Sequence, residues 1–281
     1  MDYHSIINIP IEIINIITNL LDTTDKIFFI STNTYFLRNI YIDTIIAGKF
    51  DTSPNTIITQ KFKDIKNISQ DVIIQDKFKH IKNLYLHNND NLDIMHLTKL
   101  NFLFIVDTCV SGLSFLQNLS KLHIYTIQKE SYVLQNDIEH LSLTHLSMSF
   151  NYHITNIMHL TKLIHLDISG TYSKIQQSNI NPVTNLTYLN LGNNTNITDI
   201  SHFPNLTELR TNYINNIDIS KSYNLRTLNI FNNWDNLHKL DVLLLTNLTQ
   251  LNANIEIIEY NKDILKKMTN IININSIIDK V

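Results

Sequence analysis

A spaced leucine pattern repeats from Phe78 to the last residues of this chain. Its form is L-x-x-L-x-x-L-x-I/L, and the third apolar position marks each copy. The marker residues are Leu84, Leu103, Leu122, Leu146, Leu166, Leu189, Leu209, Leu228, Leu251 and Ile274. Successive markers lie about 19 to 24 residues apart, and a unit this short cannot bury its own apolar face. The units must therefore stack on one another, which predicts an elongated fold with one continuous core.

The copy that begins at Leu186 shows how one unit is expected to fold. Leu189 and Leu191 alternate, as in a short strand whose alternate side chains share one face. Asn194 follows where the chain leaves the strand, and its side-chain amide can bond to the backbone of the turn. Ile197 then returns the chain to the core. The return segments are too short for a long helix, so turns and short helical pieces are expected there.

These residues resemble the leucine-rich-repeat family, and two copies even share the identical heptapeptide I-M-H-L-T-K-L, at Ile94 to Leu100 and Ile157 to Leu163. The resemblance implies an α/β fold. This is a leucine-rich-repeat solenoid with parallel strands on the concave face and turns and short helices on the convex face. It covers residues 78–260. Residues 261–281 are expected to cap the C-terminal end of the stack, with a short helix at 261–268.

Composition narrows the classes of partner. The chain has 281 residues, 43% of them hydrophobic, which is enough for a sizeable core. A formal net charge of −3 gives no basic surface for nucleic acid. The single cysteine, Cys109, excludes an intrachain disulfide and favours a reducing compartment. The first residues lack the basic region of a signal peptide, and no segment is apolar enough to span a bilayer. We therefore predict a cytoplasmic protein without a nucleic-acid or membrane partner.

The sequence carries no motif for catalysis. Its histidines follow the repeat, as His96 and His159 do at the same position of two copies, and they are not expected to converge on one point. With one cysteine there is no zinc-ligand pattern, and four glycines leave no phosphate-binding loop. We therefore predict that the protein is not an enzyme and needs no cofactor or metal.

The first fifty residues depart from the repeat, and residues 9–42 are predicted to form helices. Pro10 suits the first turn of a helix, and Glu12 suits its positive end. The polar residues of this helix form one narrow stripe, which indicates that more than one side of the helix is covered. A second helix is predicted from Lys26 to Arg38. Residues 1–48 are thus expected to be a separate helical module, and residues 49–77 a linker or an irregular first repeat.

The segment from Ile9 to Leu21, with Asp25-Lys26 and Tyr35-Phe36-Leu37-Arg38 after it, resembles an F-box, whose pattern begins L-P-x-E-I-L. The resemblance implies docking on a Skp-type adaptor of a cullin–RING ubiquitin ligase, while the repeats hold the substrate. It assigns the adaptor contacts to Ile9, Pro10, Ile13, Ile14, Ile17 and Leu20. The segment departs from the family in having Ile at position 9 and no tryptophan. The Ile- and Asn-rich composition, with an F-box-like segment ahead of repeats, also resembles that of proteins of amoeba-infecting giant DNA viruses.

Side chains that flank the strand leucines are expected to project onto the concave face. The predicted target-binding residues there are Tyr85, Phe102, Phe104, His123, Tyr125, Asp167, Tyr188, Arg210 and Phe231. Coverage of the first aromatics by residues 49–77 is the alternative. The sequence thus favours a non-catalytic receptor that recruits an unknown protein target to a cullin–RING ligase. The alternatives are a repeat scaffold with no ligase link, whose N-terminal helices only cap the solenoid, and a secreted adhesin.

Overall fold

The computed structural model describes residues 42–46, 62–66, 80–87, 92–126, 133–170, 173–214, 217–230 and 245–276. These fall into two compact units, which are residues 1–119 and residues 120–281. Of the segment predicted to be helical, residues 9–41 lie outside the described residues, as do the six predicted adaptor contacts, and Ile42 belongs to a strand.

The first unit carries four parallel strands, paired in chain order. They are β1 (Ile42–Ile46), β2 (Phe62–Lys66), β3 (Asn83–His87) and β5 (Phe102–Val106). The register aligns Ile45, Ile65, Leu84 and Leu103, so two strands precede the first predicted repeat. A second, two-stranded sheet and one turn of 3-10 helix complete the unit. They are β4 (Leu92–Asp93), β6 (Val110–Ser111) and η3 (Leu113–Phe115).

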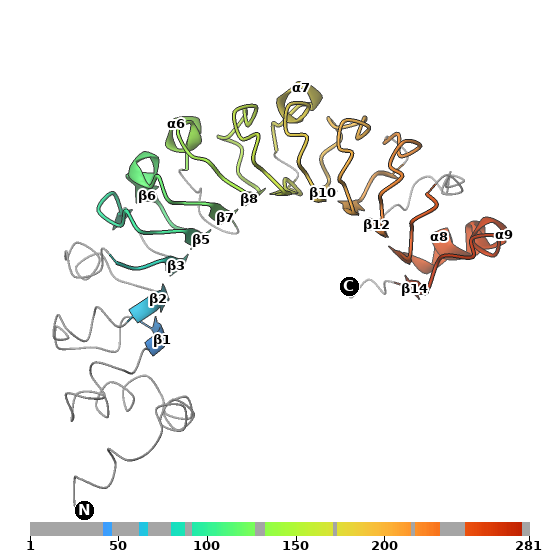
Figure 1. Ribbon diagram of the computed structural model, residues 1–281, viewed down its shortest axis with the longest axis horizontal. Coiled ribbons are helices and arrows are strands. Elements are labelled where there is room, and N and C mark those ends of the chain that lie inside the picture. The colour runs from blue at the N-terminus through green and yellow to red at the C-terminus, as the bar shows by residue number, and fades with distance from the viewer. Residues whose placement is uncertain are drawn as a thin grey trace, which may run out of the picture. The chain divides into compact units, whose positions relative to one another are not determined.

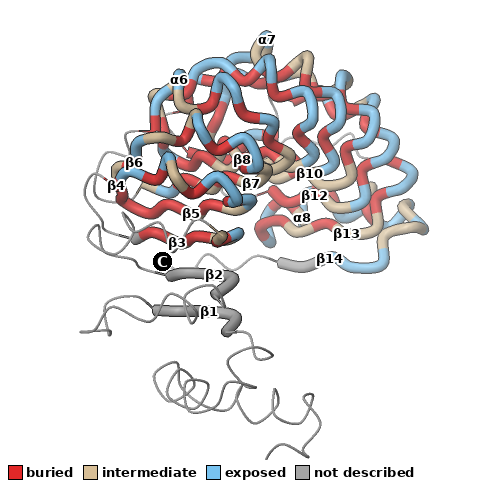
Figure 2. The backbone as a smooth tube through the Cα atoms, turned by 60° about the vertical axis from the view of Figure 1, so that its left-hand side comes forward, coloured by how far each residue is buried: buried red, intermediate tan, exposed pale blue. Residues whose placement is uncertain are grey.

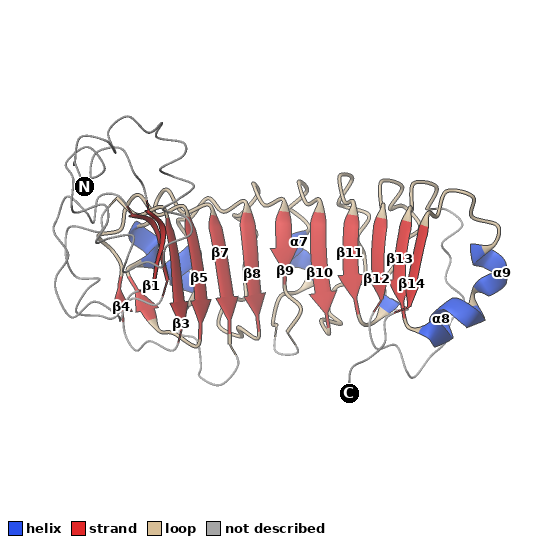
Figure 3. Cartoon of the chain, turned by 90° about the horizontal axis from the view of Figure 1, so that it is seen from below, coloured by secondary structure: helices blue, strands red, loops and turns tan. Residues whose placement is uncertain are grey.

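The second unit carries eight strands, and each pairs in parallel with the next one along the chain (Figures 1 and 3). They are β7 (Lys121–Tyr125), β8 (His145–Ser149), β9 (His165–Asp167), β10 (Tyr188–Gly192), β11 (Glu208–Thr211), β12 (Thr227–Ile230), β13 (Gln250–Ala253) and β14 (Asn273–Ser276). The short helices are α6 (Gln135–Ile138), α7 (Gln177–Ile180), α8 (Ile255–Tyr260) and α9 (Lys262–Leu265).

The predicted marker residues stand side by side across these strands. In the second unit the register joins Leu122, Leu146, Leu166, Leu189, Leu209, Leu228, Leu251 and Ile274. All of them except Ile274 are fully buried, and buried residues fill the layer between the strands and the outer turns (Figure 2). The strands lie along the inner side of the curve of this unit, and the turns and short helices along the outer side. The predicted α/β leucine-rich-repeat solenoid is therefore confirmed.

Asparagines tie successive repeats together at two positions. Asn151 and Asn194 are buried, as the turn position predicts. Asn151 Nδ2 donates to the carbonyl of Val133 at 3.1 Å, and its Oδ1 accepts the backbone N–H of Ile154 at 3.0 Å. The second position, which was not predicted from the sequence, lies just before five of the strands. There the amide nitrogen donates to a carbonyl of the preceding repeat, as in Asn118, Asn185, Asn224, Asn247 and Asn270.

The C-terminal end differs from the inner repeats. Helix α9 lies inside the helix predicted at 261–268, and α8 precedes it directly. Ile274 remains 44% exposed and Ile272 78% exposed, whereas the equivalent Leu251 is fully buried. The capping role of residues 261–281 stays a prediction. None of the described helices has the length and apolar character needed to cross a membrane.

Candidate protein-binding site on the strand face

Side chains on the strand face, the sheet surface that points away from the core, alternate with the buried leucines. In the first unit this surface holds the predicted residues Tyr85, Phe102 and Phe104, which are all partly buried. The ring of Tyr85 lies 5.1 Å from that of Phe102 and 6.1 Å from that of Phe104, measured between centroids. Spacings of this size are typical of favourable aromatic pairs. The structure thus brings these three predicted residues together.

In the second unit, four planar side chains from consecutive strands form a stack. The rings of His145 and His165 lie 5.5 Å apart at an interplanar angle of 19°. The rings of His165 and Tyr188 are stacked nearly parallel, with centroids 3.9 Å apart and an interplanar angle of 2°. The guanidinium carbon of Arg210 lies 5.3 Å from the centre of the Tyr188 ring, which is a cation–π contact. We call His145, His165, Tyr188 and Arg210 the planar stack.

Three histidines from neighbouring strands lie close together, although the histidines were not expected to converge on one point. His123 of β7 lies 6.5 Å from His165, between ring centroids, and His145 lies between their strands. We call His123, His145 and His165 the histidine cluster. The sequence analysis was wrong here because residues about 20 positions apart become direct neighbours once parallel strands pair in register. Only His123 of the three was among the predicted site residues.

Burial controls the ionisation of the planar stack. It lowers the pKa of His165 to about 4, with help from His145 and His123 nearby. Burial also lowers the pKa of His123 and of His145, and it raises the pKa of Tyr188 to about 12. Burial alone would lower the pKa of Arg210, but the hydrogen bond to Glu208 and the proximity of Tyr188 raise it. At neutral pH the stack therefore has uncharged rings and one cation at its end.

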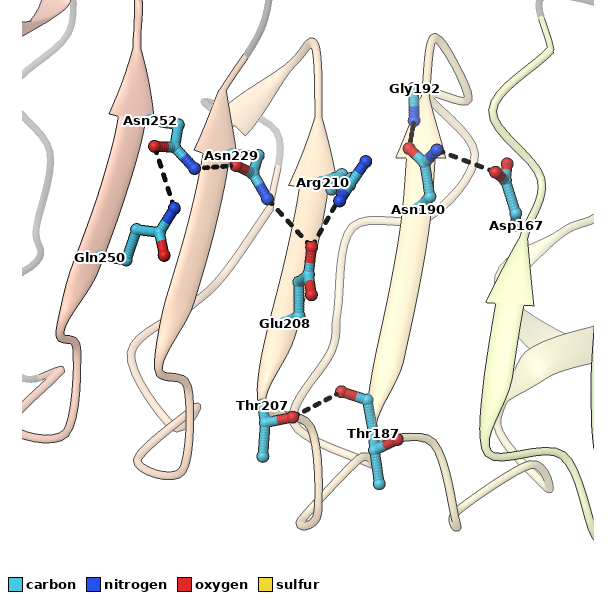
Figure 4. A network of polar contacts seen from close by, with 10 residues as sticks. All are labelled: Asp167, Thr187, Asn190, Gly192, Thr207, Glu208, Arg210, Asn229, Gln250 and Asn252. Atoms are coloured by element: carbon cyan, nitrogen blue, oxygen red, sulfur yellow. Dashed lines mark hydrogen bonds and ion pairs between the residues drawn. The ribbon is translucent and has the colours of Figure 1, made fainter. Parts of the chain in front are cut away.

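A chain of polar contacts continues from Arg210 along the strand face (Figure 4). Arg210 Nε donates to Glu208 Oε1 at 2.8 Å, and Asn229 Nδ2 donates to the same oxygen at 3.2 Å. Asn252 Nδ2 in turn donates to Asn229 Oδ1, and Gln250 Nε2 donates to Asn252 Oδ1 at 3.2 Å. The side chains thus hold one another in place across three strands, and Glu208 accepts hydrogen bonds from two of them.

Asp167, another predicted site residue, is held from two sides. Its Oδ2 accepts Asn190 Nδ2 and its Oδ1 accepts the backbone N–H of Ser169, both at 3.0 Å. Asn190 Oδ1 accepts the backbone N–H of Gly192 at 3.2 Å. Asp167 and Asn190 therefore join β9 to β10 through side chains as well as through the sheet.

A second aromatic pair lies where β7 and β8 end. Tyr125, which is 41% exposed, meets Phe150, which is 36% exposed, edge to face at 6.2 Å. Phe150 has a φ of 66°, a left-handed conformation that is rare for a bulky residue. The sequence analysis missed Phe150 because turn positions of this kind usually hold Asn or Gly. The remaining predicted residue, Phe231, lies outside the described residues.

Within the described ranges, no group of three or more His, Cys, Asp or Glu side chains is placed to hold one metal ion. What the strand face offers instead is recognition chemistry: flat aromatic rings, a cation, carboxylates and amides. Aromatic and Arg side chains are the residues most enriched at the centres of protein interfaces.

No protein-family model matches the sequence, and no curated protein matches it in a sequence comparison. A chain of the mouse RP105/MD-1 complex is similar in structure, with a TM-score of 0.49, 14% identity and 86% of this chain covered. This chain spans only 43% of that one. An internalin, InlF, from Listeria monocytogenes has a TM-score of 0.39 at 18% identity, covering 87% of this chain and 84% of its own. The functional domain of InlJ from the same organism has a TM-score of 0.42 at 20% identity, with coverages of 80% and 50%. These values support no inference about a partner.

Proposed function

We propose that this chain is a non-catalytic protein-interaction receptor whose strand face in the second unit binds a protein target. The observation that supports this most is the planar stack, which consecutive strands present on the face that the core does not use. Tyr and Arg are frequent hot-spot residues. Side chains that are already ordered lose little conformational entropy on binding, which favours affinity.

The Arg210–Glu208 ion pair contributes little to folding, which further supports a role in binding. The pair keeps 42% and 29% of its side chains exposed. Ion pairs this exposed contribute about 0 to 1 kcal/mol to stability. The buried apolar residues beneath, mostly leucine and isoleucine, supply the core. An ordered aromatic and charged surface of this kind is therefore available to a partner.

The double variant Tyr188→Ala/Arg210→Ala tests the proposal. Proximity labelling in cells, with the labelling enzyme fused to the full chain, should lose a defined set of protein partners in this variant. Circular dichroism should show an unchanged fold, because both substitutions leave the buried apolar core beneath the strand face intact. Tyr223→Ala is the matched control, since Tyr223 is 56% exposed and lies outside the strands. Identical partner sets for all three proteins would contradict binding through the strand face.

We further propose that residues 9–42 link this receptor to a cullin–RING ubiquitin ligase in the cytoplasm, through a Skp-type adaptor. The support comes from the sequence, in which Pro10, Glu12, Ile13 and Leu20 follow the F-box pattern ahead of leucine-rich repeats. The amino-acid composition, which resembles that of giant-virus proteins, suggests that the adaptor is one of the host cell.

Ile13→Asp tests this second link, because it would place a charge in an apolar interface, where an unpaired charge is strongly unfavourable. The full-length wild type should capture a Skp-type adaptor from cytosol, and Ile13→Asp should not, while both keep the same target. If the wild type captures no adaptor, the repeat scaffold without a ligase link is the better description, with the N-terminal helices serving only as a cap.

A further inference from the structure

Lys121 extends the histidine cluster into a group of four side chains that can carry positive charge. Lys121 and His123 come from β7, His145 from β8 and His165 from β9. The register places Lys121 beside His145 and His145 beside His165, on strands about 4.8 Å apart. All four are partly buried. Burial, together with the neighbouring positive groups, lowers the pKa of the three histidines.

A threonine hydroxyl anchors the ring of His145. Thr144 Oγ1 lies 3.1 Å from the carbonyl oxygen of Ser120 and 2.9 Å from His145 Nδ1. The backbone N–H groups of Thr144 and His145 donate to the same carbonyl, at 2.8 Å and 3.1 Å. The imidazole of His145 is thus held beside the start of β7.

Two carboxylates and a phenol face the cluster from the neighbouring strands. Glu208 of β11 is paired with Arg210 at 2.8 Å, and Tyr188 of β10 is uncharged. Asp167 of β9 already accepts two hydrogen bonds at 3.0 Å. The negative charge of Asp167 and the positive charge of Lys121 offset each other. While the histidines are neutral, the histidine cluster together with Lys121 and Asp167 therefore carries no net charge, and each added proton makes this group positive.

We propose that Lys121 and the histidine cluster form a proton-linked site for an acidic side chain, Asp or Glu, of the protein target. This inference rests on the proposed function, since it names the chemistry of the target at the same surface. An incoming carboxylate adds a second negative charge to that of Asp167, which already acts on His123 and His165 and which Lys121 offsets. It offsets the repulsion among the imidazolium rings and so favours their protonation. Binding of the carboxylate and uptake of protons therefore reinforce each other.

The ligand is a carboxylate rather than a phosphate because of the type of cation available. Phosphate groups are held best by the forked guanidinium of arginine. The nearest arginine on this face, Arg210, already donates Nε to Glu208. Lysine and imidazolium groups lack this planar fork and present their N–H donors in separate directions, which suits one carboxylate among several polar partners.

Binding of a fluorescent hexaglutamate peptide to the full chain tests the proposal, with hexaglutamine as the neutral control. Anisotropy would be measured at low ionic strength, at about pH 7.5 and about pH 5.5, on either side of the ordinary histidine pKa. The wild type should bind hexaglutamate about tenfold more tightly at the lower pH, as linkage to at least one proton requires. Hexaglutamine should not bind at either pH.

Three variants separate this site from a general effect of net charge. His145→Gln/His165→Gln should lose most of the gain at low pH. Lys121→Gln keeps the histidines and should weaken binding at both pH values while retaining the gain. His140→Gln removes an exposed histidine elsewhere and should behave like the wild type. An equal gain at low pH in the double-histidine variant, or no saturable binding by the wild type, would overturn the proposal. Neither result affects the partner loss expected for Tyr188→Ala/Arg210→Ala, so the two proposals fail separately.

Discussion

Acidification should destabilise the second unit through His165, and the size of the effect follows from its surroundings. Burial, with His145 and His123 nearby, lowers the pKa of His165 from 6.5 to about 4. Each pKa unit corresponds to about 1.4 kcal/mol, which sets an upper limit of about 3 kcal/mol. Because the ring keeps some contact with solvent, water screens part of the effect. We therefore expect about 1 to 2 kcal/mol.

The free energy of unfolding falls with falling pH because the unfolded chain binds the proton of this histidine before the folded chain does. The unfolded chain protonates this histidine as the pH falls through about 6.5, whereas the folded chain resists until about pH 4. The stability that His165 contributes is therefore complete above about pH 6.5. It is lost progressively as the pH falls towards 4.

His165→Phe removes the titrating group but keeps a planar ring between His145 and Tyr188. Urea unfolding at about pH 7 and about pH 4.5 should show a loss of stability for the wild type that is about 1 to 2 kcal/mol larger than for His165→Phe. His140→Gln, which removes an exposed histidine, should lose as much as the wild type. Equal losses for His165→Phe and the wild type would refute the assignment of the acid sensitivity to this position.

Three further substitutions test the packing of the solenoid, each read as the midpoint of thermal unfolding by circular dichroism. Leu189→Ala should destabilise by about 2 to 5 kcal/mol because Leu189 is fully buried; a small change would contradict a tightly packed core. Asn194→Ala should lower the free energy of unfolding by about 1 to 3 kcal/mol, because the buried carbonyl of Ile175 would lose the Asn194 Nδ2 donor at 3.3 Å. An unchanged midpoint would mean that the buried turn asparagine is dispensable. Gly170→Ala should also lower the midpoint, because its Cβ would lie 2.2 Å from the backbone nitrogen of Phe150; a tolerated alanine would show that this turn can shift.

The leucine spacing sufficed to predict the fold because one apolar position per repeat fixes both the strand and its register. Leu189 and Leu209, for example, are both markers in the sequence and direct partners in the sheet. The buried turn asparagine at Asn194 was likewise predictable, since a turn inside a stack needs a donor and an acceptor. Strand β1 was not predicted, and β2 lies in residues 49–77, for which a linker and an irregular first repeat were both left open. The reason is that Ile45 and Ile65 stand without the leucine triplet that marks the other copies.

The site was less predictable because it depends on contacts between repeats. His145 and His165 are ordinary repeat histidines until the register places their rings 5.5 Å apart. The stacking of Tyr188 on His165, and the position of Arg210 over Tyr188, depend in the same way on side-chain directions that spacing alone does not specify. Tyr188 and Arg210 do lie on the strand face, since they alternate with buried leucines, and their role in binding a target stays a prediction.

The proposed function requires one chain to bind a target on its strand face while its N-terminal segment binds a ligase adaptor. Precipitation of the Skp-type adaptor from cells that express the full chain tests this most directly, with the target quantified in the precipitate. In cells that express the wild type, the adaptor precipitate should contain both the chain and the target. With Tyr188→Ala/Arg210→Ala it should contain the chain without the target. With Ile13→Asp it should contain neither. Recovery of the target with the strand-face variant, or the absence of wild-type chain from the adaptor precipitate, would contradict the account.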